Sequence, residues 1–475
     1  MMSGRELALR TLMLMEKRQA FSNIALSRAL AETGTGEGAE AALATELLYG
    51  VLRWMGAIDY IIDRYSRYPV AKLTLPIRNI LRLAVYQVYF LSRIPSYAAV
   101  DEAVRAAKRY GHRGTVGLVN AVLRRLPPDM DDNEWPDRQA EPVAYLSTRQ
   151  SHPAWMVERW ISAYGFEGAL SICRANNEHP PLTLRTNVLR TAPDKLRCSL
   201  AEKGYHVADG RLFPEALNLA EGIGLWSTPE YAEGLFQPQD EASMCVAHAL
   251  SPLPGQSVLD LCSAPGGKST HVAEMMADKG HVLSVDINAA RLGLVRANAV
   301  RLGIGIIDTL QLDAREFTRH VSDLFDAVMV DAPCTGTGVL RRKPEIKWRL
   351  VPEKLHELPE LQTAILSEAA RAVRPGGTLV YSTCSIEPEE GIEIIDDFLR
   401  TNAAYGLVDL SERLPSCLHM DLSPTTNNRQ PTTASALEER RSIPAGILRL
   451  LPGEHGTDGF FLAAMRRSDN YGRQS

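Results

Sequence analysis

Three absences narrow what this chain of 475 residues can be. It has only 7 cysteines, and no two stand at C-x-x-C spacing, so neither a disulfide scaffold nor a structural zinc site is expected. Its most apolar stretch, residues 83–91, is about half the length of a membrane helix. Arg5, Glu6 and Arg10 interrupt the N-terminus before a signal-peptide core could form. These absences favour a cytoplasmic protein without membrane contact, and no metal site is expected.

The composition is that of a globular protein, with 45% hydrophobic and 23% charged residues, and the length predicts two or three domains. The net charge of −5 is unevenly divided. Residues 1–130 carry 18 Lys and Arg against 11 Asp and Glu, whereas the remainder carries 34 against 46. A basic head (residues 1–130) joined to an acidic body (the remaining residues) indicates that the head binds a polyanion. Ordinary solvation of helix faces is an equally good explanation of this charge.

Residues 1–130 are expected to be entirely helical. In residues 76–91, apolar side chains recur at three- and four-residue steps, which marks one face of a helix. A second helix is expected over 96–110, with Gly111 as its stop. The basic residues between 93 and 125 are Arg93, Arg105, Lys108, Arg109, Arg113, Arg124 and Arg125. Arg109 and Arg113 are candidate RNA ligands, because phosphate contacts dominate affinity for nucleic acids. A solvated helix pair is the alternative.

The sequence pattern changes twice in the rest of the chain. Residues 131–136 are acidic and turn-rich, and up to residue 236 the mixed pattern predicts a small α+β module with strands near 182–188 and 224–226. From residue 237, short apolar runs alternate with helix-length segments, which predicts a doubly wound parallel sheet. The expected strands are 257–261, 281–285, 309–312, 325–330 and 377–381, followed by 406–410 and 459–465. The Ser/Thr/Pro/Asn-rich residues 422–435 are expected to form a surface loop.

A glycine turn follows the first strand of this expected sheet. It reads Cys262, Ser263, Ala264, Pro265, Gly266, Gly267, Lys268 and leads into a helix, whose first N–H groups can meet a ligand. Asp286 ends the next strand, at the spacing where an acid typically receives ribose hydroxyls. The turn lacks the G-x-G-x-x-G pattern of a pyrophosphate site. S-adenosylmethionine is therefore favoured over NAD as the cofactor.

Two cysteines occupy corresponding positions after neighbouring strands. Cys334 follows Asp331-Ala-Pro after the fourth strand, and Cys384 follows Ser-Thr after the fifth. Ligands bind beyond the carboxyl ends of such strands, so both thiols are expected beside the cofactor. A thiolate that attacks C6 of a pyrimidine makes C5 nucleophilic towards a methyl group, whereas N-methylation needs no thiol. Asp331 is placed to stabilise the ring near N3, and the spacing alone does not say which cysteine attacks.

A basic loop follows Cys334. Its cationic residues are Arg341, Arg342, Lys343, Lys347 and Arg349, and they stand against a single acid. Trp348 in the same loop could stack on a base. This combination suits a single-stranded or flipped nucleotide, with an ordinary charged surface loop as the alternative.

These motifs resemble those of the RNA cytosine-5 methyltransferases of the NSUN/RsmB group. The resemblance rests on the stretches 331–338 and 381–385, and it extends to 237–242, 262–268, Asp286, Asp313 and the late Asp458-Gly-Phe-Phe. The helical head, through residues 78–84 and 120–125, resembles the NusB-like RNA-binding domain fused to one branch of that group. That branch acts on bacterial 16S ribosomal RNA.

The resemblance implies a multidomain chain. Residues 1–130 would form an all-α NusB-like bundle, 131–236 a small α+β linker module, and 237–470 a Rossmann-like class I methyltransferase domain of α/β type. It also implies that Cys384 is the nucleophile and that Cys334 serves proton removal and product release. The methyl donor would be held by residues 262–268, Asp286 and Asp313, with Asp331 at the junction with the target base.

The activity implied by the resemblance is transfer of a methyl group from S-adenosylmethionine to C5 of a specific cytosine in 16S ribosomal RNA. Thr335 stands where the family usually has serine, and the segment 415–450 is longer than the pattern requires. The same chemistry on transfer RNA or at another ribosomal site is one alternative. A non-catalytic RNA-binding scaffold is the other, although two cysteines and an intact donor turn argue against it.

Overall fold

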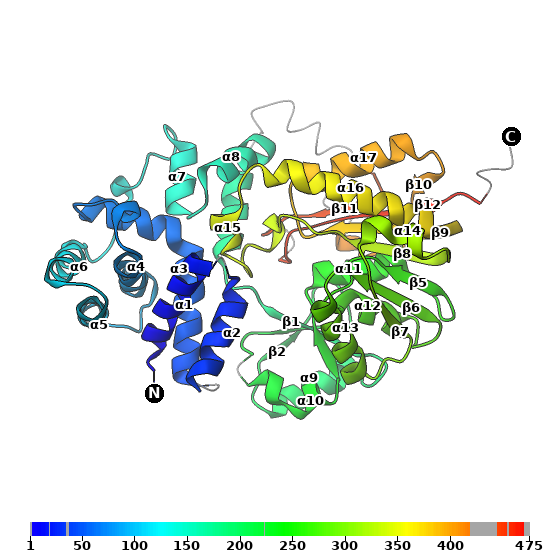
Figure 1. Ribbon diagram of the computed structural model, residues 1–475, viewed down its shortest axis with the longest axis horizontal. Coiled ribbons are helices and arrows are strands. Elements are labelled where there is room, and N and C mark those ends of the chain that lie inside the picture. Colours follow the sequence, from blue (N-terminus) through cyan, green and yellow to red (C-terminus); the bar gives the residue numbers. More distant parts are fainter. Residues whose placement is uncertain are drawn as a thin grey trace. The chain divides into compact units, whose positions relative to one another are not determined.

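The computed structural model describes residues 2–18, 20–34, 38–222, 224–418, 444–453 and 456–469. The chain forms two compact units (Figure 1). The helical unit comprises Met1–His179 and Leu340–Arg349, and the α/β unit comprises Pro180–Val339 and Leu350–Ser475. The boundaries between these two units differ from the domain boundaries expected at residues 130 and 236. The expected loop at 422–435 lies outside the described residues. None of the described helices is long and apolar enough to cross a membrane.

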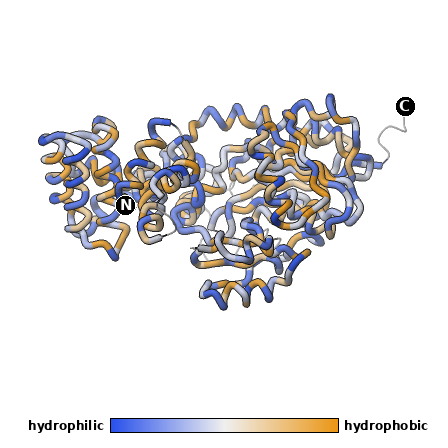
Figure 2. Tube along the Cα trace, turned by 60° about the horizontal axis from the view of Figure 1, so that its bottom comes forward, coloured by the Kyte–Doolittle hydropathy of each residue, from blue (hydrophilic) through white to orange (hydrophobic). Residues whose placement is uncertain are grey.

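The helical unit is built from amphipathic helices, whose trace alternates between blue and orange in Figure 2. They are α1 (Gly4–Arg18), α2 (Ser22–Thr33), α3 (Ala39–Tyr65), α4 (Leu75–Phe90), α5 (Ser96–Tyr110), α6 (Arg113–Arg125), α7 (Pro142–Arg149), α8 (Ala154–Asn177) and the short α15 (Ile346–Arg349). The helices expected over 76–91 and 96–110 are confirmed as α4 and α5. The predicted apolar face of α4 is buried at Ile77, Ile80 and Ala84.

Helix α4 is buried around most of its circumference, so its polar side chains need partners inside the core. Arg82 bonds bidentately to Asp59, at 2.7 Å for both nitrogen–oxygen pairs, and reaches Glu16 at 3.2 Å. Asn79 donates to the same Glu16 at 2.7 Å. Buried polar groups are tolerated when they are paired in this way.

Residues 340–349 complete the helical unit beside a break in α3. The backbone of α3 leaves helical geometry at Trp54 (φ −107°, ψ 16°). The Lys347 ammonium donates to the carbonyl oxygens of Arg53 at 2.7 Å and Ser151 at 2.9 Å. The Trp348 indole donates to the carbonyl of Leu52 at 2.5 Å. The inserted segment therefore provides donors for carbonyls near the kink, which a regular helix would satisfy internally.

The α/β unit contains a small antiparallel sheet with strand order β2-β3-β1-β4. Its strands are β1 (Leu182–Thr186), β2 (Val207–Asp209), β3 (Ala216–Leu219) and β4 (Phe236–Pro238), and α9 (Pro193–Glu202) and α10 (Pro229–Ala232) accompany them. The expected α+β module is thus confirmed, with β1 inside the predicted 182–188. The strand predicted at 224–226 is wrong. Gly224 adopts a left-handed conformation (φ 73°) and starts a 3₁₀ turn over Leu225–Ser227.

The larger sheet has the order β10-β12-β9-β8-β5-β6-β7, and β11 pairs with β12. Its strands are β5 (Ser257–Asp260), β6 (His281–Asp286), β7 (Ile307–Gln311), β8 (Phe325–Asp331), β9 (Val373–Thr383), β10 (Tyr405–Leu407), β11 (Ile447–Leu450) and β12 (Phe460–Arg467). Strands β5 to β9 run parallel, as predicted. The pairs made by β12 are antiparallel, so the sheet is mixed.

Helices cover both faces of this sheet (Figure 1). One face packs α11 (Glu241–Leu250), α12 (Gly267–Met275) and α13 (Ala289–Leu302) against side chains such as Val258 and Val282. The other packs α14 (Phe317–His320), α16 (Lys354–Ala372) and α17 (Ile392–Thr401) against Leu259 and Val285. Successive residues of a strand point to opposite faces, so each run is apolar throughout. A ligand can bind at the carboxyl ends of the parallel strands.

Candidate active site

Acidic residues and the two thiol loops meet at the carboxyl ends of the parallel strands. Strands β5, β6 and β8 end at Asp260, Asp286 and Asp331. Strand β9 ends at Thr383, directly before Cys384. β5 pairs with both β6 and β8, so the order of the strands along the chain reverses at β5. This is the switch point at which open α/β sheets bind their ligands.

The turn 262–268 has the geometry required for close approach of a ligand. Gly266 is left-handed (φ 97°), and a Cβ there would lie 3.0 Å from Val295, so glycine is required for the turn. A Cβ on Gly267 would meet no atom within 4 Å. Ser263 Oγ is buried without a hydrogen-bond partner in the described part of the chain. An open backbone and an orphaned hydroxyl fit a polar cofactor at this turn.

The two acids beyond the turn lie at the ends of neighbouring strands: Asp286 ends β6, and Asp313 follows β7. The Asp286 carboxylate accepts from the backbone N–H of Ala264 at 3.3 Å, which ties it to the turn. The N–H of Leu312, next to Asp313, donates to the carbonyl of Asp286 at 3.3 Å. Asp313 caps the following 3₁₀ turn, and its hydrogen bonds with Arg315 lower its pKa. The structure therefore brings both expected cofactor acids to one edge, with Asp313 already engaged by Arg315.

Arg185 of β1 fixes the start of α12, a function that the sequence did not indicate. Its guanidinium is completely buried. It donates to the Gly267 carbonyl at 2.7 Å and pairs with Glu274 at 2.8 Å. The small antiparallel sheet thus supports the cofactor turn directly, because one of its side chains binds the first and last turns of α12.

The two cysteines meet despite being 50 residues apart in the sequence. Cys334 Sγ lies 3.3 Å from Cys384 Sγ. The Gly338 N–H donates to the Cys384 carbonyl at 2.9 Å, and the Gly459 N–H donates to the Gly338 carbonyl at 2.8 Å. The loops after β8 and β9 and the residue before β12 are therefore bonded together through their backbones. This bonding fixes the separation of the two sulfurs.

Glu390 is a buried carboxylate that holds the Cys334 loop from behind. Its Oε1 accepts from the Thr335 N–H at 2.9 Å and from Gln362 Nε2 at 3.0 Å. The Thr335 hydroxyl donates to its other oxygen. Thr335 thus provides the hydroxyl of the serine usual at that position. Nothing in a single sequence distinguishes Glu390 from the other acids around it, such as Glu387, Glu389 and Glu393.

Lys268 places a cation beside Asp331. Its ammonium lies 2.7 Å from Asp331 Oδ2, and the other oxygen of Asp331 accepts from Ser382 Oγ at 3.1 Å. Burial would lower the pKa of Lys268, but Asp331 and a negative charge on Cys384 raise it above its ordinary value. The ammonium also lies 5.4 Å from the centre of the Phe460 ring. Lys268 therefore keeps its charge where it can stabilise a thiolate.

The environment of Cys334 disfavours its thiolate form. The hydrogen bond between Cys334 and Cys384, burial, and a negative charge on Cys384 raise the pKa of Cys334 well above its usual value. Burial also raises the pKa of Cys262 in the cofactor turn. Asp260 is buried behind that turn, which raises its pKa to about 7 although Ser269 donates to it at 2.6 Å. Cys334 and Cys262 are therefore thiols at neutral pH.

The basic loop belongs to the helical unit and is less exposed than expected. Lys347 and Arg341 are buried in the helical unit, and Trp348 is bonded to α3, so an exposed cationic loop with a stacking tryptophan is wrong for these three side chains. The break in α3 creates acceptors that Lys347 satisfies. Arg342 and Arg349 are half-buried, and Lys343 is the exposed member of the five cationic residues.

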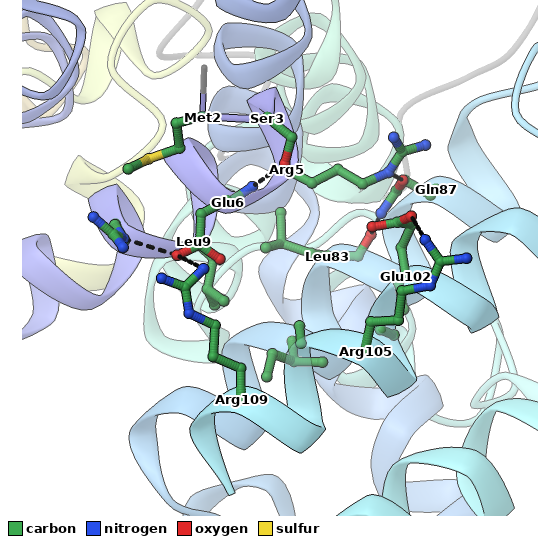
Figure 3. Close-up of a pocket in the computed structure, with 15 residues that line it drawn as sticks. Met2, Ser3, Arg5, Glu6, Leu9, Leu83, Gln87, Glu102, Arg105 and Arg109 are labelled. Atoms are coloured by element: carbon green, nitrogen blue, oxygen red, sulfur yellow. Dashed lines mark hydrogen bonds and ion pairs between the residues drawn. The ribbon is translucent and has the colours of Figure 1, made fainter. Parts of the chain in front are cut away.

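The basic residues of α5 and α6 are exposed. RNA binding by these helices would require this exposure. Arg113 has no ion-pair partner within the described residues, whereas Arg109 approaches Glu6 at 3.3 Å. Arg109 also borders a hollow of about 540 Å³ between α1, α4 and α5. Figure 3 shows this hollow with arginines and glutamates at its rim and Leu9 and Leu83 among its lining residues.

The mixed sheet, the glycine turn at its switch point and the paired thiols define a methyltransferase of the doubly wound α/β class. The family model for 16S rRNA methyltransferase RsmB/F matches residues 247–466. The NusB family model matches residues 2–127, and a ferredoxin-like domain model of the RsmF/B type matches 152–225. These models cover the three modules expected from the resemblance.

Whole-chain relatives agree with these models. A Bacillus subtilis (strain 168) protein named probable ribosomal RNA small subunit methyltransferase B is 38% identical over 98% of this chain and 99% of its own. One crystal structure aligns with 98% of both chains at a TM-score of 0.77 and 26% identity. That of a methyltransferase homologue from Pyrococcus horikoshii covers 67% of this chain and 96% of its own, at a TM-score of 0.54 and 28% identity. The chain belongs to the RsmB/F family of 16S rRNA methyltransferases.

Proposed function

We propose that this enzyme transfers a methyl group from S-adenosylmethionine to C5 of a specific cytosine in 16S ribosomal RNA, through a covalent bond between Cys384 and C6. The observation that carries the proposal is the thiol pair, 3.3 Å apart, beside the Lys268–Asp331 ion pair. Methylation of a ring nitrogen or a ribose needs no thiol, and two adjacent thiols fit the addition and elimination that C5 chemistry requires.

The electrostatics of the site support Cys384 as the nucleophile. The thiolate is the reactive form of cysteine. The Lys268 cation stabilises negative charge on Cys384, and the raised pKa of Cys334 keeps that neighbour protonated. In this proposal, Cys334 donates the hydrogen bond between the two sulfurs in the resting enzyme, and Cys384 accepts it. The family resemblance assigns the two cysteines in the same way.

The proposed reaction proceeds by addition, methyl transfer and elimination. The Cys384 thiolate forms a bond to C6, and the electrons of the C5=C6 bond become available at C5. Asp331 holds the Lys268 ammonium beside the target base, and this cation offsets the negative charge that develops on the ring. S-adenosylmethionine, when bound, supplies an electrophilic methyl group, and residues 262–268, Asp286 and Asp313 would hold it. Cys334 then takes the C5 proton, the C5=C6 bond reforms, and the Cys384 thiolate leaves.

Cys334 can change from acid to base because its surroundings change. Once Cys384 is bonded to C6, it no longer carries the negative charge that raises the pKa of Cys334. Cys334 then loses its proton to solvent more readily than in the resting enzyme. The same thiol is a hydrogen-bond donor before the addition and a base after it. A cytoplasmic location with ribosomal RNA as partner belongs to the same proposal.

The test is methyl transfer from labelled S-adenosylmethionine to unmodified 16S RNA, with wild type and Cys384→Ala assayed in parallel and bulk transfer RNA as second substrate. We expect labelled 5-methylcytidine at one position of 16S RNA, with wild type only. Label in a different nucleoside would refute the proposed chemistry. Label in transfer RNA alone would refute the proposed target.

A further inference from the structure

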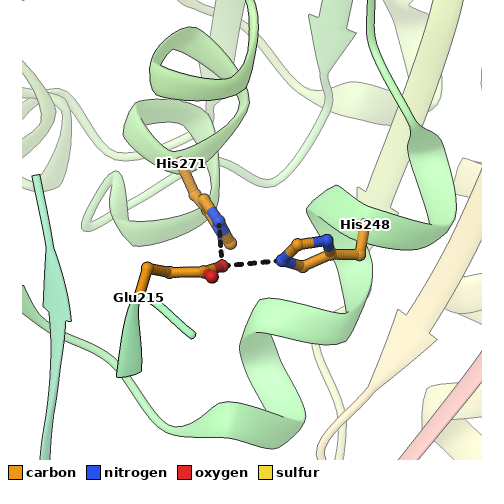
Figure 4. Close-up of side chains that lie close together, drawn as sticks. All are labelled: Glu215, His248 and His271. Atoms are coloured by element: carbon orange, nitrogen blue, oxygen red, sulfur yellow. Dashed lines mark hydrogen bonds and ion pairs between the residues drawn. The ribbon is translucent and has the colours of Figure 1, made fainter. Parts of the chain in front are cut away.

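We propose that Glu215, His248 and His271 form a site for a divalent transition-metal ion of the zinc type. The three side chains come from separate parts of the α/β unit: the residue before β3, helix α11 and helix α12. One ligand atom from each lies within 4.8 Å of the other two. Figure 4 shows both imidazole rings directing a nitrogen at the same carboxylate oxygen of Glu215. The absence of C-x-x-C pairs argues against zinc sites with cysteine ligands, but not against a site with histidine and glutamate ligands.

The distances suit zinc coordination. His271 Nε2 lies 3.4 Å from Glu215 Oε1, and His248 Nε2 lies 2.7 Å from the same oxygen. Tetrahedral zinc with bonds near 2.0–2.1 Å separates its ligand atoms by about 3.3 Å. The His271 pair already has this separation, and the His248 pair would have to separate by about 0.6 Å. Two imidazoles and one carboxylate are a donor set that zinc accepts, with a fourth position left for water.

The charge of the cluster favours a cation. Glu215 has an 11% exposed side chain, and the described part of the chain places no arginine or lysine within ion-pair distance of it. The nearby Arg185 is engaged by Glu274. Buried carboxylates are stable when a cation is close.

The ligands are held in place before any ion arrives. The His248 ring stacks on Phe213 with centroids 4.1 Å apart and 7° between the planes. The side chain of His271 is only 3% exposed, whereas that of His248 is 22% exposed and gives the ion a route from solvent. Because α12 begins in the cofactor turn, a metal here would connect the small sheet to the helix that carries that turn. This role is independent of the methyl-transfer proposal.

Metal content and metal affinity test the site without an activity assay. We expect wild type, treated with a chelator and dialysed, to bind zinc in competition with a chromophoric chelator and to melt at a higher temperature with zinc. His248→Ala should weaken binding by at least about 100-fold, the upper range for loss of even an outer-shell partner. His271→Gln should do the same, and the part-exposed His248 keeps the test usable if the buried variant does not fold.

Two controls make the result specific. His281→Ala removes a histidine that pairs with Asp308 at 3.0 Å at an exposed position without a third ligand, and it should bind zinc like wild type. Cys384→Ala should also bind zinc normally. Zinc binding that is lost in Cys384→Ala and kept in His248→Ala would place the metal at the thiols and overturn the proposal. Absence of zinc binding by wild type would show that the cluster is a hydrogen-bonded triad only.

Discussion

At the scale of single residues, Lys268 has a function that its position in the sequence does not reveal. The glycine turn that contains it predicts contact with the cofactor. The structure adds an ion pair with Asp331 at 2.7 Å and a raised pKa that depends partly on Cys384. A cofactor-binding lysine and a thiolate-stabilising lysine differ in what their removal does to the pH dependence of the reaction.

Lys268→Met should therefore move the acidic limb of the kcat/KM profile to higher pH by about one to two units, since an adjacent opposite charge shifts a pKa by that order. In wild type the cation persists through neutral pH because its pKa is raised. Without the Lys268 cation, the Cys384 thiolate forms only at higher pH. The alkylation rate of Cys384 by iodoacetamide as a function of pH gives the same shift without RNA. A lower rate with an unchanged pH profile would contradict this function.

Glu390 is the second residue whose function comes only from the structure. Glu390→Gln removes the charge that accepts from Thr335 and Gln362. We expect kcat to fall by about 10- to 100-fold, the order expected for a small misplacement of reacting groups. The Kd for S-adenosylmethionine, measured by calorimetry, should not change. Glu360→Gln, at an exposed position of α16, is the matched control. Equal kcat values for the two variants would refute this positioning.

At the scale of elements, the closest backbone approach in the site lies at Gly338. A Cβ there would collide with the Gly459 carbonyl and would lie 2.9 Å from the carbonyl of Cys384. These are backbone atoms, so they cannot move aside as a flexible side chain would. The loops after β8 and β9 can therefore meet only through glycine.

Gly338→Ala should separate the two thiol loops and reduce methyl transfer by about 100-fold or more. Gly406→Ala in β10 is the control, because its Cβ would meet no atom within 4 Å. Disulfide trapping by a mild oxidant reports the separation of Cys334 and Cys384 directly. Trapping at the wild-type rate in Gly338→Ala would contradict the proposed close contact.

The elements also show which structural features can be read from sequence. Apolar runs define the parallel strands, because both faces of that sheet are buried and every residue of a run must be apolar. The short strands β2 and β3 and the 3₁₀ turn at Leu225–Ser227 carry no such pattern. Burial of Lys347 depends on a break in α3, and the contact of Arg185 with α12 spans more than 80 residues. Local pattern cannot encode such contacts.

At the scale of the whole molecule, charge divides the chain into a basic head and an acidic body, and we expect the head to contribute to RNA binding. Arg113, Arg124 and Arg125 are exposed, and the described part of the chain gives them no ion-pair partners. Replacing all three by alanine should lower the salt slope of RNA binding by about two, since each phosphate contact with single strands contributes about 0.7. Arg105→Ala is the control, because Asp101 and Glu102 already neutralise Arg105. Equal slopes for both variants would exclude α6 from the RNA interface.

The central claim is that Cys384 is the nucleophile and that Cys334 removes the C5 proton. A denaturing gel tests this assignment most directly. Cys334→Ala, incubated with 16S RNA and S-adenosylmethionine, should accumulate a covalent RNA–protein adduct, because Cys384 still attacks C6 and the C5 proton is not removed. Cys384→Ala and the double variant should form none. An adduct with Cys384→Ala and none with Cys334→Ala would reverse the two assignments. No adduct with either variant, while the RNA and the donor remain bound, would contradict the covalent mechanism.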